Sequence, residues 1–316
     1  MNTPSGAMNT PSEAASEYPI STVSVAARIS VSQRMYWLVR RELWENRFVY
    51  IAPAAVAALA LLASLVSIAH MAGDMRDAVE TSAIQWQGAI ENVFRMVSLM
   101  VMGVSFIVAI FYCLEALHGE RKERSILFWK SMPVSDLETV LSKAAIPVLI
   151  LPVISYTITV LTQALLLLGG SVVMAAMGQG AGTIWSNLPI SQMLGMLLFH
   201  LLVMHGLWYA PIYGWLLMVS AWARRAALLW ATLPLAAIAI AEMVAFHTSH
   251  FAAMLGSRLS GNGPASEAFP NPGAMHPLMH MEAGRFLLSA GLWVGLLVFG
   301  VFLAAAVQLR RYRAPL

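Results

Sequence analysis

Six long apolar runs constrain the fold of this chain more than any other feature. An α-helix needs about 20 apolar residues to cross the roughly 30 Å of hydrocarbon in a bilayer, and each run is close to that length. In lipid, a helix satisfies its own backbone hydrogen bonds. We therefore predict an all-α integral membrane protein whose six-span transmembrane domain covers residues 48–308. The predicted spans are Phe48–His70, Val93–Leu114, Ala144–Leu168, Met193–Val219, Ala226–Phe246 and Phe286–Gln308.

The composition excludes an ordinary soluble protein. Hydrophobic residues make up 59% of the 316 residues and charged residues 11%, whereas soluble domains contain about 25% charged residues. The net charge is only +3, and the basic residues are not clustered with aromatic residues in a soluble domain. We therefore expect membrane lipids, and no nucleic acid, among the partners. Cys113 is the only cysteine, so an intrachain disulfide is impossible.

Prolines predict irregular helices in two of the spans. Pro147 and Pro152 lie in the third span and Pro211 lies in the fourth. Proline removes a backbone donor, so these spans need kinks that neighbouring helices can satisfy. The fourth run is the longest, and we expect it to tilt or break.

The distribution of lysine and arginine predicts the orientation. Basic residues favour the cytoplasmic side of a membrane, and with the N-terminus inside, 15 of the 19 lysines and arginines fall there. Both termini are then cytoplasmic, with a periplasmic loop at residues 247–285 and a basic tail at residues 309–316. The four basic residues left outside are Arg76, Arg95, Arg258 and Arg285.

The residues before the first span predict a tail and an amphipathic helix. Residues 1–27 are rich in Ser, Thr, Pro and Ala, and such a segment stays disordered because it has little apolar surface to bury. Residues 30–47 have helical periodicity. Tryptophan and arginine beside a span suit a helix lying in the headgroup region; the alternative is a cytoplasmic lead-in. The apolar face holds Met35, Tyr36, Val39 and Leu43; Arg34, Arg41 and Glu45 lie opposite, and Trp37 and Trp44 share one side.

The most charged segment of the chain is the cytoplasmic loop at residues 115–143, which reads EALHGERKERSILFWKSMPVSDLETVLSK. Gly119 can end the preceding helix, and Ser135 with Glu138 forms a capping box that starts a new one. Between them we predict a short coupling helix that docks on a soluble partner; the alternative is a charged loop with its aromatic residues in lipid. The predicted docking residues are Glu120, Arg121, Glu123, Arg124, Ile126, Leu127, Phe128, Trp129, Lys130 and Pro133.

The sequence contains no motif for nucleotide binding or catalysis. None of the three lysines follows the glycine pattern of a phosphate-binding loop. HExxH is absent, and Phe106 replaces the small residue that would follow Ser105 in a serine nucleophile motif. We therefore expect no enzyme activity in this chain and no bound cofactor. If ATP and Mg²⁺ drive the protein, a separate subunit binds them.

The loop resembles the first cytoplasmic loop of type-2 ABC exporter permeases. An acidic-basic run, an apolar turn, a Pro-Val-Ser step and a downstream lysine follow in that order from Glu120 to Lys143, although residues 125–129 lack the Gly-Thr-Leu start of many members. The six spans and the lead-in helix also match. The resemblance implies a permease dimer, formed with itself or a sister chain, and two ATPase subunits. Such a complex in a bacterial inner membrane exports a hydrophobic or amphipathic substrate, such as a lipid, peptide or drug.

A few polar residues in or near the spans are candidates for a transport path or a metal site. Glu242 is the only carboxylate well inside a predicted span, and His200 and His205 lie in the fourth. Thioether and imidazole groups suit copper, so a weak metal candidate is the group Met275, His276, Met279 and His280. An interfacial helix explains that group equally well. The alternative functions are therefore a membrane scaffold or assembly factor, or a copper-handling membrane protein.

Overall fold

The computed structural model describes residues 30–75, 83–122, 134–176, 190–260 and 286–312. Every regular element in these ranges is helical, and six helices are long and apolar enough to cross a membrane. The predicted all-α membrane protein with six candidate spans is thus confirmed. The expected disordered tail, the centre of the 115–143 loop and residues 261–285 lie outside the described ranges.

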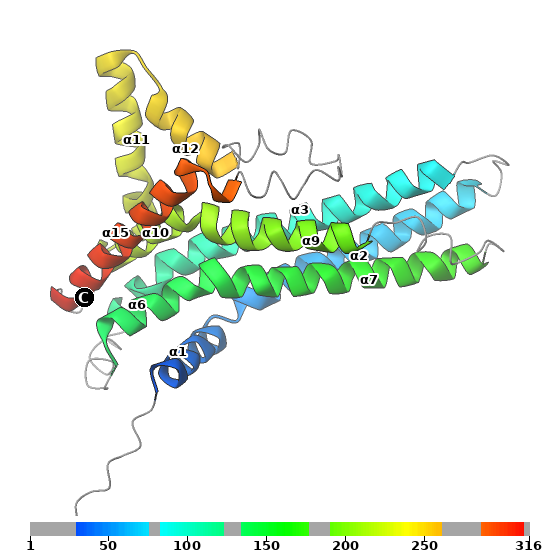
Figure 1. Cartoon of the computed structure of the whole chain (residues 1–316), viewed down its shortest axis with the longest axis horizontal. Coiled ribbons are helices and arrows are strands. Elements are labelled where there is room, and N and C mark those ends of the chain that lie inside the picture. The colour runs from blue at the N-terminus through cyan, green and yellow to red at the C-terminus, as the bar shows by residue number, and fades with distance from the viewer. Residues whose placement is uncertain (1–29, 76–82, 123–133, 177–189, 261–285, 313–316) are drawn as a thin grey trace, which may run out of the picture.

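Three long helices form one half of the bundle. They are α2 (Phe48–Met75), α3 (Ala83–Ala116) and α7 (Leu151–Ala176), which lie side by side in Figure 1. Their apolar contacts include the small side chain of Ala57 and the large one of Phe94. The Ser105 and Ser155 hydroxyls, 2.6 Å apart, link α3 to α7. Such polar contacts help helices associate in lipid, where apolar surface alone provides little driving force.

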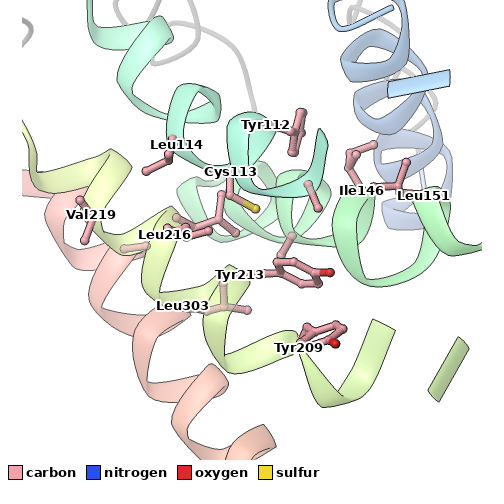
Figure 2. Close-up of a cluster of buried hydrophobic side chains, with 14 of the residues drawn as sticks. Tyr112, Cys113, Leu114, Ile146, Leu151, Tyr209, Tyr213, Leu216, Val219 and Leu303 are labelled. Atoms are coloured by element: carbon pink, nitrogen blue, oxygen red, sulfur yellow. The ribbon is translucent and has the colours of Figure 1, made fainter. Parts of the chain in front are cut away.

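The other half is built on two packed helices, α10 (Ala210–Trp222) and α15 (Ala290–Tyr312). Gly214 allows their close approach, because a Cβ there would lie 2.7 Å from the ring of Phe299. The apolar core between the two halves is shown in Figure 2. Tyr213 of α10 and Tyr112 of α3 both belong to this core, and both tyrosines are almost fully buried.

The third and fourth spans are irregular at the predicted prolines. The third consists of α6 (Asp136–Ala145), the π-helix η1 (Ile146–Ile150) and α7. Pro147 lies in η1, and Pro152 lies in the first turn of α7. The fourth consists of α9 (Ile190–Phe199), the nine-residue π-helix η2 (His200–Trp208) and α10. It breaks at Tyr209, two residues before Pro211, so the expected irregularity is confirmed.

The two π-helices touch through a glycine. A Cβ on Gly206 of η2 would lie 2.4 Å from the backbone oxygen of Val148 in η1. That oxygen belongs to the backbone and cannot swing away as a side chain would. Gly206 is therefore the residue that lets the fourth span approach the backbone of the third at Val148.

We predict that Gly206→Ala destabilises the protein by about 1–3 kcal/mol, because overpacking forces the two π-helices apart. Thermal denaturation in detergent, followed by size-exclusion chromatography, measures the effect. Gly195→Ala in α9 is the matched control, because a Cβ there meets nothing within 4 Å. A Gly206→Ala protein as stable as the control would contradict the contact.

The N-terminal helix α1 (Val31–Glu45) begins at a capping box formed by Ser30 and Gln33. Its buried residues are Leu38 and Glu42, so the bundle-facing side includes a carboxylate. Of the predicted apolar face, Met35, Val39 and Leu43 are half-buried and Tyr36 is exposed. Trp37 and Trp44 are also exposed, and the Arg40 guanidinium lies 5.2 Å from each ring centroid. This outer face suits the expected headgroup location.

Helices α11 (Ala227–Phe246) and α12 (His250–Ser260) form a V that projects from the bundle in Figure 1. Left-handed backbone at Ala226 and His247 marks the two ends of α11. Ala231 is the only buried residue of α11. Helix α12 returns toward the start of α15, so its C-terminal end reaches the bundle.

Candidate functional site

Five charged side chains meet at one end of the bundle. This ion cluster comprises Glu42 of α1, Glu120 of the short helix α4 (His118–Lys122), Asp136 and Lys143 of α6, and Arg310 of α15. Four of them are buried, and Asp136 is partly exposed. Buried charges are stable only when they are paired and hydrogen-bonded, so the cluster fixes how four separate helices meet.

Lys143 is the centre of the ion cluster. Its ammonium group lies 2.7 Å from Glu42 Oε1 and 3.1 Å from Glu120 Oε1. The Tyr112 hydroxyl of α3 donates to the other oxygen of Glu42 at 2.9 Å. Lys143 is only 3% exposed, so water cannot replace these partners. One lysine therefore joins α1 to α4 on the inside of the protein.

Arg310 extends the cluster to the C-terminal helix. Its guanidinium group pairs with Glu120 Oε2 and, through Nε, with Asp136 Oδ1 at 3.0 Å. Glu120 thus bonds to Lys143 and Arg310 at once. Three carboxylates against two cations leave a formal charge of −1, which the Tyr112 hydroxyl helps to stabilise through Glu42.

A second set of bonds fixes α4 on α10. The Ser220 hydroxyl donates to Leu114 O and accepts from the backbone N–H groups of Leu117 and His118. Arg121 donates to the carbonyls of Ala221 and Ala223 at the C-terminal end of α10, where a cation is favoured by the helix dipole. The break between α3 and α4 is therefore set by Ser220. The expectation that Gly119 ends the helix is wrong, because Gly119 lies inside α4.

The start of α6 is held by a capping box and by an ion pair with α1. Ser135 and Glu138 form the predicted capping box, and Glu138 also pairs with Arg34 of α1 at 2.9 Å. The described chain stops before the centre of the loop at Lys122, the last residue of α4, and resumes at Val134, two residues before α6. Both helices are held by the contacts described above. A force applied to the loop would pass to α1 through Glu42 and to α15 through Arg310.

The predicted docking residues fall into two groups. Glu120 and Arg121 are buried in the contacts described above, which gives both a role within this chain. Whether they also contact a partner stays a prediction. The remaining docking residues lie outside the described residues, namely Glu123, Arg124, Ile126, Leu127, Phe128, Trp129, Lys130 and Pro133.

The predicted transport-path residues lie on two different elements, with His200 and His205 in η2 and Glu242 in α11. Glu242 accepts hydrogen bonds from the Thr248 hydroxyl and from the backbone N–H groups of His250 and Phe251, each at 2.8 Å. It thereby caps the N-terminal end of α12, which accounts for a carboxylate at this position. A role for Glu242 in transport stays a prediction.

The two histidines of η2 differ from each other. His200 Nδ1 lies 3.2 Å from Met196 O within its own span. His205 is fully buried, and neither ring nitrogen has a hydrogen-bond partner in the described structure. Its ring lies among the aromatic rings of Phe106, Tyr209 and Tyr213.

The metal candidates cannot be placed. Met275, His276, Met279 and His280 lie outside the described residues. Within the described ranges, no group of three or more His, Cys, Asp or Glu side chains could hold a metal ion.

Four members of the ion cluster were not among the predicted site residues, namely Glu42, Asp136, Lys143 and Arg310. Glu42 is buried on α1 although no role was predicted for it, and Arg310 was counted only as an orientation signal. Glu42 and Lys143 are 101 residues apart, and Glu120 and Arg310 are 190 apart. The available signal was a glutamate at helical spacing from Leu38 and Val39, close to a buried face.

Comparison of the chain with protein-family models, with curated proteins and with solved structures gives no match.

We predict that Lys143→Met destabilises the protein by about 3–5 kcal/mol, because it leaves buried carboxylates without a cation. Adding Glu42→Gln should restore part of this loss, since it removes one of those carboxylates. Thermal denaturation of the single and double variants measures the coupling between the two positions.

Glu45→Gln is the matched control for Lys143→Met. Glu45 pairs with Arg41 on the exposed side of α1, where such pairs contribute about 0.3–0.5 kcal/mol. Equal melting temperatures for Lys143→Met and Glu45→Gln would show that the cluster does not hold this end together.

Proposed function

We propose that this chain is the permease subunit of an ABC exporter in a bacterial inner membrane. It would move a hydrophobic or amphipathic substrate outward, driven by two copies of a separate ATPase subunit. The observation that carries the proposal is the ion cluster. It ties both anchored sides of the charged loop to α1 and α15, as a loop that receives force from a partner requires.

The sequence supports an external source of energy. The chain lacks a phosphate-binding loop, so ATP and Mg²⁺ would bind to the partner. Closure of the two ATPase subunits would pull on the loop between α4 and α6. Packed cores are bistable rather than continuously deformable, so α4, α6 and α15 would move as units through the pairs of Glu120 with Lys143 and Arg310.

A second permease copy completes the proposed complex. Helix α11 is the best candidate for contact with it, because most of its large apolar side chains are exposed and Ala231 is its one buried residue. The substrate would pass between the two copies. The apolar surfaces of the bundle favour a lipid, a hydrophobic peptide or a drug as that substrate.

We predict that the double variant Phe128→Ala/Trp129→Ala loses the ATPase subunit during purification. Buried aromatic anchors in interfaces each contribute about 2 kcal/mol or more, so the loss of both should reduce the complex by well over roughly 10-fold. Co-purification of an ATPase with the affinity-tagged permease, followed by mass spectrometry, measures it.

Trp293→Ala is the control for that double variant. Trp293 is an exposed aromatic residue of α15, remote from the loop in the sequence, so its removal should leave the complex intact. An undiminished ATPase complex in Phe128→Ala/Trp129→Ala would remove the docking claim.

We predict that the variant Lys130→Cys reacts with a membrane-impermeant maleimide only from the cytoplasmic side. The native Cys113 is fully buried, so background labelling should be low. Ser249→Cys, at the exposed turn between α11 and α12, should react only from the periplasmic side. Inside-out and right-side-out vesicles separate the two cases, and periplasmic labelling of Lys130→Cys would invert the proposed topology.

A further inference from the structure

Arg258 of α12 occupies a narrow slot between the fourth span and α15. Its guanidinium carbon lies 3.9 Å from the ring centroid of Trp208, and its NH1 donates to Gly291 O at 3.1 Å. The other wall is Gly295, where a Cβ would lie 1.7 Å from the Arg258 NH2. Only glycine at position 295 leaves room for the guanidinium in this place.

Two backbone carbonyls at Arg258 and Leu259 also accept hydrogen bonds from the fourth span. Trp208 Nε1 donates to Arg258 O at 3.2 Å, and the Tyr209 hydroxyl donates to Leu259 O at 3.3 Å. These carbonyls belong to the last turn of α12, where a helix cannot satisfy them itself. The C-terminal end of α12 is therefore seated on the fourth span, and the half-buried side chain of Arg258 lies against Trp208 and α15.

The slot lies at membrane depth. Gly295 and Arg310 are both in α15, and 15 residues of helix correspond to about 22 Å. If the ion cluster marks one border of the roughly 30 Å hydrocarbon layer, the guanidinium lies within that layer, near its opposite border. An arginine inside the layer costs about 2.5–3.5 kcal/mol on insertion scales unless it is compensated.

No carboxylate compensates this arginine within the described structure. The elements around it, namely η2, α10, α12 and α15, contain no aspartate or glutamate. Glu242 caps the opposite end of α12, about 12 Å away along the helix, and its oxygens are already bonded there. Among the described residues, one of the five guanidinium N–H groups donates a hydrogen bond, to Gly291 O.

We propose that Arg258 binds the anionic head group of an amphiphile whose chains lie in the half of the membrane remote from the ion cluster. A phosphate or carboxylate supplies both the missing charge and acceptors for the fork of guanidinium N–H groups. A phosphate-bearing membrane lipid and a single-chain substrate share this chemistry. Binding needs only this chain; the assignment of the amphiphile as cargo rests on the proposed exporter function.

Native mass spectrometry of the full chain in dodecyl maltoside tests the proposal. The probes are dodecyl phosphate, inorganic phosphate, dodecyl trimethylammonium and phosphatidylglycerol. We expect saturable binding of dodecyl phosphate and none of the cationic analogue. Phosphatidylglycerol that survives purification and competes with dodecyl phosphate identifies a resident lipid, whereas failure of phosphatidylglycerol to compete points to a single-chain ligand.

Three variants assign the binding to Arg258. Arg258→Gln should weaken dodecyl phosphate binding roughly 10-fold or more, since a hydrogen bond to a charged group is lost, and Arg258→Lys should weaken it less. Gly295→Ala keeps the charge but expels the guanidinium from the slot, so it tests the geometry even if Arg258→Gln fails to fold. Arg311→Gln, at the exposed end of α15, changes the net charge equally and should have no effect.

Two results would overturn the proposal. One is equal dodecyl phosphate affinity in the wild type, Arg258→Gln and Gly295→Ala, which would leave Arg258 as a purely structural contact between α12 and Trp208. The other is inorganic phosphate binding as tightly as dodecyl phosphate, which would show that the alkyl chain contributes nothing. Both results are independent of whether an ATPase co-purifies, so failure of this proposal and of the exporter proposal are distinguishable.

Discussion

The arrangement of one end of this protein depends on a lysine that water cannot reach. Lys143 is 3% exposed, and a charge in that position must find its countercharges in the protein. Glu42 and Glu120 supply them. Because these two carboxylates come from α1 and α4, the lysine requires an N-terminal helix and a short loop helix to meet at the same point of α6.

The same pairing requirement attaches α4, at one end of the charged loop, to the rest of the bundle. An ordinary surface loop would be joined to the bundle by exposed pairs that each contribute little. Here Glu120 bonds to both Lys143 and Arg310, while Ser220 and the carbonyls beyond it hold α4 against α10. Displacing the loop without moving α10 and α15 would therefore leave buried charges unpaired. This is the physical reason for regarding the loop as a coupling element.

Local features of the sequence predicted the helices well, because the signals are contained in single segments. Length and apolarity located six candidate spans, Pro147 and Pro211 located the irregular regions, and Ser135 with Glu138 located the start of α6. The contacts of Glu42 with Lys143 and of Glu120 with Arg310 could not be predicted in the same way. They join residues more than 100 positions apart, and each residue alone looks like a solvent-facing charge.

Local reasoning also failed where a distant side chain decides the geometry. Gly119 has the usual chemistry of a helix end, yet the break occurs earlier because Ser220 of α10 bonds Leu114, Leu117 and His118. Periodicity placed Met35, Tyr36, Val39 and Leu43 on one apolar face, whereas the two buried residues of α1 are Leu38 and Glu42. The pairing of Glu42 with Lys143, rather than the largest apolar side chains of α1, determines which side of this helix is buried.

A cation lies at each end of α15, and the two cations differ in whether a carboxylate neutralises them. At Arg310 the charge is answered by Glu120 and Asp136 within the chain, so that end is closed and rigid. Near Gly295 the guanidinium of Arg258 meets an aromatic face and a carbonyl but no anion in the described structure. Arg310 is buried and Arg258 is half-buried, so each cation loses hydration that a partner must replace. The closed end therefore suits transmission of force, and the open end suits a ligand that brings its own negative charge.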